Sequence, residues 1–175
     1  MIETNRLLIK PLTSQELKKH IESPGAFAQE IGLIPSESLV DKDTKDAILN
    51  DLLPNIADIS KDTLFYTMWI IIEKNQKAII GGICFHGEPN EYGEVEIGYG
   101  IDIEYRNMGY MTETISGVIQ WAKKNKKVKS ITAETESTNI PSIKVLDKNG
   151  FEVNQRNSNT VQMRLELNKI ISDNF

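Results

Sequence analysis

A glycine loop between a strand and a helix is the stretch of this 175-residue chain whose residue types and spacing could do chemistry. Residues 94–112 read EVEIGYGIDIEYRNMGYMT. Apolar residues alternate with small or polar ones up to Ile101, which predicts a strand, and from Thr112 they recur at helical spacing. Such a turn directs free backbone N–H groups and the positive end of the helix dipole at one point, which suits a phosphate. Gly109 would let a ligand approach the backbone, and Arg106 would pair with a phosphate oxygen. An ordinary connecting turn that contains a glycine is the alternative.

A cysteine and a histidine could form a nucleophilic pair. Cys84 and His86 stand two residues apart on a predicted strand, so their side chains share a face. No third group that would orient the imidazole is evident, and a cysteine in the strand core is the other interpretation. The chain's two histidines, His20 and His86, have no cysteine or carboxylate at metal-ligand spacing, which predicts no metal site.

Three blocks of the chain resemble the GNAT N-acetyltransferase superfamily, and most closely its RimJ/RimL-type ribosomal-protein N-terminal acetyltransferases. Residues 106–111 (RNMGYM) are similar to the Arg/Gln-x-x-Gly-x-Gly/Ala segment that wraps the pyrophosphate of acetyl-coenzyme A, with Met111 in place of the usual small residue. Residues 139–151 (NIPSIKVLDKNGF) look like the family's Asn-x-x-Ser and Leu-x-Lys-x-Gly-Phe segments. Residues 5–12 (NRLLIKPL) look like the opening strand of the subgroup.

The resemblance implies acetyl-CoA as co-substrate. The loop would hold the pyrophosphate, and backbone N–H groups at residues 100–103 would hold the pantetheine and polarise the thioester. The acetyl-CoA-binding residues expected by resemblance are Ile101, Asp102, Ile103, Arg106, Asn107, Met108, Gly109, Tyr110, Met111, Thr112, Asn139, Ser142 and Lys148.

Acetyl transfer to an amine needs a base, because an amine with a pKa near about 10 is mostly protonated at neutral pH. Glu96 lies on the strand that leads into the loop, and Glu134 lies on the following strand, five residues before Asn139. Either glutamate could take the proton. A structural carboxylate in a cross-strand pair or on the surface is the alternative for each.

The departing thiolate needs a proton donor. Many members of the family use a tyrosine on the last helix, and Leu146 occupies that position here. The resemblance assigns the role to Ser142, with Tyr99 and Tyr110 as other candidates. A serine that only stabilises the start of its helix is the alternative for Ser142.

The other elements follow from periodicity and capping signals. Thr13 and Glu16 are spaced as a capping box, and Pro54 should bend or end its helix. Gly81 and Gly82, inside a strand, predict a bulge or a close backbone approach. Helices are expected over residues 13–22, 42–53, from 112 to the lysine run 123–127, and 141–149, with a short helix and a loop in 24–42. Strands are expected over residues 2–12, 64–73, 78–86, 94–101, 128–134, 151–154 and 160–167.

These elements predict one domain, 1–175, of the α/β (α+β) class. The successive strands should pair as antiparallel hairpins, and the strand–helix–strand unit after residue 94 should form a right-handed parallel crossover. By resemblance, the fold is a twisted sheet of about seven strands, mostly antiparallel with a central parallel pair, and helices cover both faces. Residues 94–151 would form the acetyl-CoA-binding core, and the helical region 24–62 would shape the acceptor site, with 27–39 as a candidate lid or as plain core packing.

Composition excludes some function classes. The net charge of −5 argues against a general nucleic-acid binder. The single cysteine fits a reducing compartment, the N-terminus lacks the features of a signal peptide, and no apolar stretch reaches membrane-spanning length, so a cytoplasmic location is expected. The lysine run 123–127 should complement the helix dipole, although one lysine could touch the ribose phosphate of the cofactor.

Two other functions fit parts of the sequence. A catalytically silent acyl-CoA-binding module is one, because Met111 and Leu146 depart from the family pattern. A structural partner protein, with Met68 and Trp69 at an oligomer interface, is the other. The acceptor of an active enzyme stays open between a small-molecule amine and a protein N-terminal amine, and a homodimer is common in the family.

Overall fold

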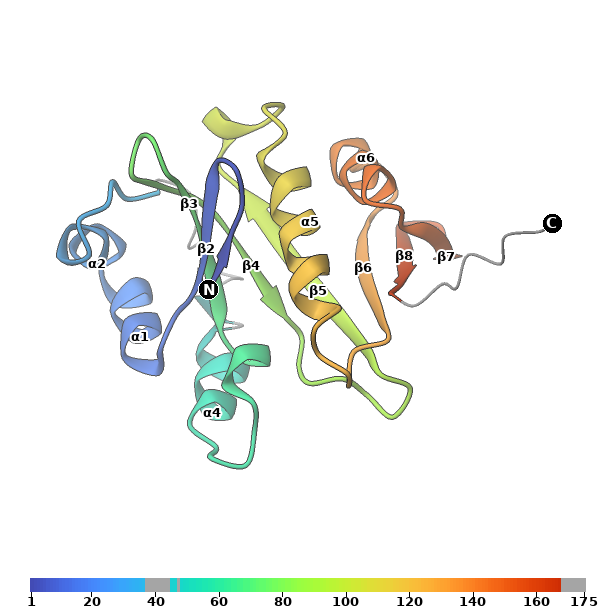
Figure 1. The fold of residues 1–175 in the computed structure, drawn as a ribbon, viewed down its shortest axis with the longest axis horizontal. Helices are drawn as coiled ribbons and strands as arrows, with labels where there is room; N and C mark the ends of the chain where they lie inside the picture. The colour runs from blue at the N-terminus through green and yellow to red at the C-terminus, as the bar shows by residue number, and fades with distance from the viewer. Residues whose placement is uncertain (37–44, 47, 168–175) are drawn as a thin grey trace.

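One mixed sheet organises the chain. The structure is a computed structural model that describes residues 1–36, 45–46 and 48–167, in which eight strands follow the order β1-β2-β3-β4-β5-β6-β8-β7 (Figure 1). The strands are β1 (Ile2–Glu3), β2 (Leu7–Pro11), β3 (Met68–Glu73), β4 (Ala78–Phe85), β5 (Glu94–Ile101), β6 (Ser130–Glu136), β7 (Glu152–Arg156) and β8 (Thr160–Glu166). All neighbours are antiparallel except β5 and β6, so the predicted topology is confirmed.

The eighth strand comes from a division that the sequence did not reveal. Residues 2–12 were expected to form one strand, but they form the antiparallel pair β1 and β2. Thr4 closes the turn between them. Its backbone N–H donates to the Leu7 carbonyl at 3.0 Å, and its hydroxyl accepts from the Leu7 N–H at 3.1 Å. The prediction that Leu7 and Ile9 share one face of the strand is confirmed, because both are fully buried.

Helices cover both faces of the sheet. One apolar layer contains α5 (Tyr110–Ala122) and α6 (Ile140–Lys148). The other contains α1 (Ser14–Glu22), α2 (Pro24–Glu30) and the π-helical turn η1 (Ile48–Leu52). Because side chains alternate along a strand, Ile71 of β3 belongs to the first layer while Ile70 and Ile72 belong to the second.

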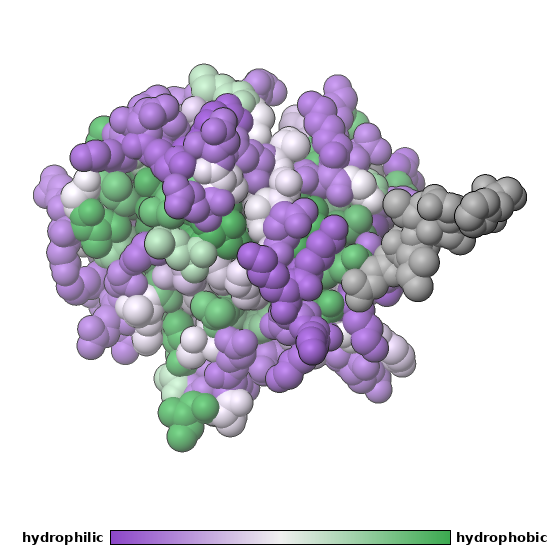
Figure 2. Space-filling view, viewed as in Figure 1, coloured by the Kyte–Doolittle hydropathy of each residue, from purple (hydrophilic) through white to green (hydrophobic). Residues whose placement is uncertain are grey.

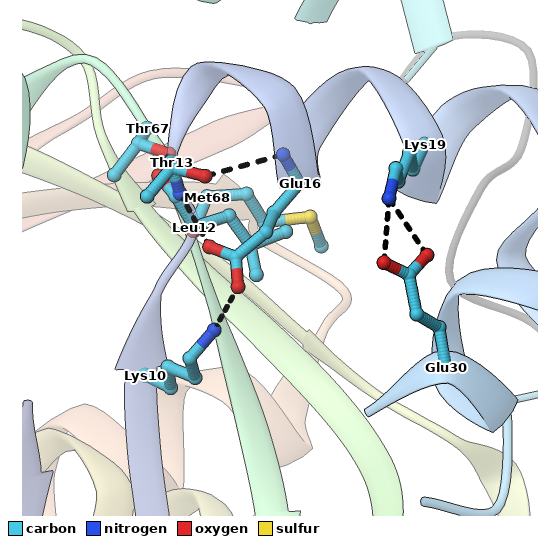
Figure 3. Close-up of polar contacts among 8 residues, drawn as sticks. All are labelled: Lys10, Leu12, Thr13, Glu16, Lys19, Glu30, Thr67 and Met68. Carbon is cyan, nitrogen blue, oxygen red and sulfur yellow. Dashed lines mark hydrogen bonds and ion pairs between the residues drawn. The ribbon is translucent and has the colours of Figure 1, made fainter. Parts of the chain in front are cut away.

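The predicted capping box at the start of α1 is present (Figure 3). The Thr13 hydroxyl accepts from the Glu16 N–H at 3.2 Å, and the Thr13 N–H donates to the Glu16 carboxylate at 2.8 Å. Lys10 forms an ion pair with the same carboxylate. Lys19 donates to both carboxylate oxygens of Glu30, at 2.6 and 2.8 Å, and so joins α1 to α2.

The helix expected over 42–53 differs from its prediction. Residues 42–44 and 47 lie outside the described residues. Residues 45–46 are helical as expected, and from Ile48 the chain forms η1 and then α4 (Leu53–Ile56), which continues past Pro54 instead of ending there. Proline lacks the N–H that a regular α-helical turn would use, and a wide π turn before it accommodates that loss. The Asn55 side chain donates to the Asp51 carbonyl at 2.7 Å and satisfies one carbonyl of this turn.

Some element boundaries also move. Strand β3 starts at Met68 rather than residue 64, because Thr63–Phe65 form the 3-10 turn η2, capped by the Asp62 side chain. Helix α5 begins at Tyr110, two residues before the expected start. The glycine pair Gly81-Gly82 does mark a close approach, since a Cβ at Gly81 would lie 2.5 Å from the Gly100 carbonyl oxygen.

The parallel pair shapes the site. Strands β5 and β6 pair only where Glu94, Val95 and Glu96 face Ser130, Ile131 and Thr132. Beyond that point each strand continues without pairing to the other. Figure 1 shows α5 in front of the sheet along β5, with α6 beside β6. Among the described residues, no helix combines the length and apolar character that a membrane span requires.

Candidate active site

A cavity of about 550 Å³ lies between the unpaired end of β5, the start of α5 and α6. Figure 2 shows a notch in the surface between α5 and α6, at the upper edge of the view. The loop from β5 to α5 passes through the 3-10 turn η3 (Ile103–Tyr105). The lining residues are Tyr99, Gly100, Ile101, Tyr105, Arg106, Asn107, Gly109, Tyr110, Met111, Thr112, Asn139, Pro141, Ser142, Lys144, Val145 and Lys148.

Most residues expected to bind the cofactor come together here. The expected residues that line the cavity are Ile101, Arg106, Asn107, Gly109, Tyr110, Met111, Thr112, Asn139, Ser142 and Lys148. Three expected residues do not line it: Asp102, Ile103 and Met108. Asp102 is buried, its N–H donates to the Ile80 carbonyl at 2.9 Å, and its carboxylate accepts from Ser36 at 2.6 Å.

The start of α5 has no side-chain cap. Gly109 occupies the N-cap with φ +79°, and no side chain caps this helix, whereas Thr13 caps α1 and Asn139 caps α6. The N–H groups of the first turn have no acceptor within the helix. The left-handed φ of +79° is also a conformation that glycine adopts without strain. Met111, the departure from the family pattern, is buried in the core.

Positive side chains border this helix end. Arg106 lies on the loop, and its Nε donates to the Ile101 carbonyl at 3.3 Å. Lys144 and Lys148 line the cavity from α6. The sequence reasoning missed Lys144, although its spacing of four residues from Lys148 places both on one face of a helix.

Arg6 is a second residue that the sequence reasoning missed. From the β1–β2 turn it reaches the loop between β5 and α5, where its Nη1 donates to the Met108 carbonyl at 2.9 Å. Its guanidinium lies 4.3 Å from the ring centroid of Tyr110. Its Nε and its backbone N–H donate to the Glu113 carboxylate at 2.7 and 2.8 Å. Arg6 therefore fixes the shape of the loop and neutralises a carboxylate in the first turn of α5.

Two candidate proton donors meet at the cavity. The Tyr99 hydroxyl lies 2.8 Å from Ser142 Oγ. Ser142 also stands at the start of α6, where its N–H donates to the Asn139 side chain at 3.2 Å. Burial raises the pKa of Tyr99, although the Ser142 hydrogen bond acts in the opposite direction. Leu146 is fully buried, and Tyr110 stacks against Arg6 and Tyr105 instead.

The two candidate bases lie elsewhere. Glu96 and Glu134 do not line the cavity. Because Glu96 faces Thr132 in the parallel pair, and Glu134 follows Thr132 by two residues, both glutamates share the opposite face of the sheet. Oε1 of Glu96 lies 3.0 Å from Nδ1 of His86, and Glu134 is exposed.

Cys84 and His86 do not form a nucleophilic pair. Desolvation raises the pKa of the Cys84 thiol to about 11, with a smaller contribution from the Glu96 charge. A thiol with this pKa is almost entirely protonated at neutral pH and is a poor nucleophile. His86 bonds to Glu96 rather than to Cys84. Within the described ranges, no three His, Cys, Asp or Glu side chains are grouped to hold a metal ion.

A groove of about 710 Å³ adjoins the cavity. It runs between β1, α5 and the end of α6, and it shares Gly109, Thr112 and Lys148 with the cavity. Lys124, from the run at the end of α5, also lines it.

Comparisons with known proteins agree with this geometry. Residues 6–152 match the family model for the acetyltransferase (GNAT) domain. The chain is 30% identical over 161 residues to the uncharacterized N-acetyltransferase YjdG of Bacillus subtilis (strain 168), an alignment that covers 90% of this chain and 93% of that protein. The ribosomal-protein-S5-alanine acetyltransferase of Vibrio fischeri has a similar fold, with a TM-score of 0.69, 19% identity, and coverage of 96% and 97%. RimL, a ribosomal L7/L12 alpha-N-protein acetyltransferase solved in complex with coenzyme A, gives a TM-score of 0.64, 11% identity, and coverage of 93% and 95%.

Proposed function

The chain belongs to the GNAT acetyltransferase family, and we propose that it moves an acetyl group from acetyl-CoA to a primary amine by direct transfer in a ternary complex. The observation that carries this proposal is the cavity at the uncapped start of α5. Residues 94–151 act as the acetyl-CoA-binding core of a single domain. The region 24–62 acts as the acceptor side.

The chemistry of the cavity suits the phosphates of coenzyme A. The pyrophosphate needs N–H donors and positive charge, which the first turn of α5 and the side chains of Arg106, Lys144 and Lys148 supply. Open space lies beside Gly100, where an added Cβ would meet no atom within 4 Å. The ribose phosphate would lie in the part of the adjoining groove that borders Gly109 and Lys148.

Each residue then has a role in the transfer. Acetyl-CoA supplies the acetyl thioester. The hydroxyls of Tyr99 and Ser142, which share a hydrogen bond, lie where the unpaired part of β5 meets α6 and give a proton to the departing thiolate. Glu96 and Glu134 place negative charge on the opposite face of the sheet, where the amine approaches and must lose its proton.

A protein N-terminal amine is the acceptor we favour. Two proteins of similar fold, a ribosomal-protein-S5-alanine acetyltransferase and a ribosomal L7/L12 alpha-N-protein acetyltransferase, support this class. A small-molecule amine is the other class.

The test is acetylation of short peptides that begin with alanine or serine, followed by mass spectrometry. We expect a mass increase of one acetyl group on the free N-terminus and none on the same peptides with a blocked N-terminus. Spermidine serves as the small-molecule arm. Binding of acetyl-CoA without transfer to any peptide or amine would instead support the silent acyl-CoA-binding module.

A further inference from the structure

His86 and Glu96 form a hydrogen-bonded pair on the acceptor side of the sheet. They are neighbours across β4 and β5, where the His86 N–H donates to the Glu96 carbonyl at 3.0 Å. Their side chains meet as well, with Nδ1 of His86 3.0 Å from Oε1 of Glu96. Both side chains reach solvent, with exposed fractions of 52% and 39%, so a substrate can reach them.

The pairing fixes the chemical state of the imidazole. An ionised carboxylate can only accept a hydrogen bond, so Nδ1 of His86 carries the proton. In the neutral ring, Nε2 then holds the free lone pair, the arrangement that a general base requires. The carboxylate of Glu96 also stabilises the positive charge that the ring gains when it takes a proton.

The free nitrogen lies over the strand that leads to the cavity. A Cβ added at Gly98 would stand 2.8 Å from Nε2 of His86, so the imidazole occupies the space that any other residue at 98 would fill. Gly98 is followed by Tyr99 and Gly100, which line the cavity. Nε2 is therefore close to the point where β5 leaves β6.

Another carboxylate of β5 on the same face, Glu94, does not contact His86. Glu94, two residues before Glu96, forms an ion pair with Arg164 at 2.6 Å. Glu94 thus provides a matched control, a carboxylate on the same strand and face whose charge is already compensated.

We propose that His86, oriented by Glu96, is the catalytic base of the acetyl transfer, an inference that rests on the proposed function. The acceptor nitrogen bonds to the acetyl carbon, and its proton passes to Nε2 of His86. The bond from that carbon to sulfur breaks, and the thiolate takes a proton from the Tyr99–Ser142 pair. Glu96 is then a positioning residue. Before the next turnover the proton on His86 leaves to solvent, and the Tyr99–Ser142 pair regains a proton from solvent.

Histidine NMR tests the placement without any acceptor. The chain has only two histidines, so the imidazole spectrum contains two sets of signals. Addition of acetyl-CoA should shift the His86 signals and leave those of the buried His20 in place, and His86→Gln assigns them. Unmoved His86 signals, with acetyl-CoA binding shown by a thermal shift, would overturn the inference alone. Absence of any binding would overturn the proposed function as well.

Kinetics test the role. With an alanine-initiated peptide, His86→Ala should lose about 100-fold or more in kcat, with the KM for acetyl-CoA unchanged. Added imidazole should restore turnover in a dose-dependent manner, which a purely structural histidine would not allow. Gly98→Ala, which displaces the ring, should also lower kcat, whereas Glu94→Gln should not. Wild-type kcat in His86→Ala, or a loss that imidazole does not restore, would contradict the assignment.

Discussion

Tyr99 and Ser142 show how single residues suit the reaction. Burial raises the pKa of Tyr99, so its hydroxyl keeps its proton at neutral pH and can donate it. The 2.8 Å contact with Ser142 Oγ joins the two hydroxyls into one donor. Leu146, where many members of the family carry a tyrosine, is fully buried and offers no polar atom.

If the two hydroxyls act as one unit, their substitutions are not additive. Tyr99→Phe and Ser142→Ala should each lower kcat by about 10- to 100-fold, and the double variant should lose little more than either single variant. Steady-state kinetics on the three variants measures this, with acetyl-CoA affinity as the control for folding. Fully additive losses would show that the hydroxyls act separately, and wild-type turnover in Ser142→Ala would remove serine from the mechanism.

At the scale of elements, the N-terminal hairpin supports the loop between β5 and α5. Arg6 contacts the Met108 carbonyl, the Tyr110 ring and the Glu113 carboxylate. Arg6→Ala would free the loop and leave the negative charge of Glu113 uncompensated beside an anion site. We expect acetyl-CoA to bind about tenfold more weakly, a loss of about 1.4 kcal/mol, measured by calorimetry.

The double variant separates the two causes. Arg6→Ala combined with Glu113→Gln should recover part of the lost affinity, because the repulsion is removed while the loop stays unsupported. An Arg6→Ala variant that binds acetyl-CoA like the wild type would contradict this role of the hairpin.

The glycine pair of β4 offers a matched test of strand packing. A Cβ at Gly81 would lie 2.5 Å from the backbone oxygen of Gly100, whereas one at Gly82 would lie 2.4 Å from the terminal methyl of Met68. The methyl can move and the backbone cannot. Gly81→Ala should therefore lower the free energy of unfolding by about 2–3 kcal/mol and Gly82→Ala by less than about 1 kcal/mol. If urea unfolding gave the same loss of unfolding free energy for both variants, the backbone of β4 and β5 would have to move to make room for the added Cβ at residue 81.

Local signals made part of this structure predictable. The capping box of α1, the extent of β5 and the glycine before α5 follow from residues close together in the sequence. The division of β1 from β2 depends on the side-chain hydroxyl of Thr4, and the π turn before Pro54 depends on how a helix adapts to a proline. The periodicity of apolar residues in the sequence indicates neither the division of the strand nor the π turn.

The site was predictable to a similar degree. The resemblance located the loop and α6, which supply most of the cavity. The contacts of Arg6 and the His86–Glu96 and Tyr99–Ser142 pairs join segments distant in the sequence, and only the tertiary fold brings them together.

At the scale of the whole molecule, one buried histidine affects how the stability of the fold depends on pH. The layer with α1 and α2 contains His20, which is almost fully buried against Phe27. Neither ring nitrogen of His20 has a hydrogen-bond partner among the described residues. Burial lowers the pKa of His20, because the charged form would lose its hydration.

This histidine should make the fold sensitive to mild acid. The folded state holds fewer protons on His20 than the unfolded state, so the free energy of unfolding should fall as the pH drops below about 6.5, by up to about 1.4 kcal/mol per pH unit. Denaturation between pH 7 and 5 measures the slope. His20→Phe should flatten it. An unchanged slope in His20→Phe would assign the sensitivity to other groups.

Acetyl-CoA binding at the start of α5 is the central claim, and a thermal shift tests it most directly. Acetyl-CoA at about a hundred times its Kd should add about 2.7 kcal/mol, which corresponds to a rise in Tm of about 5 °C or more for a chain of this size. Free CoA should retain the shift, ATP should not produce it, and Arg106→Ala should reduce it. A wild-type chain whose Tm does not change at saturating acetyl-CoA would contradict the assignment of this cavity and the acetyl transfer built on it.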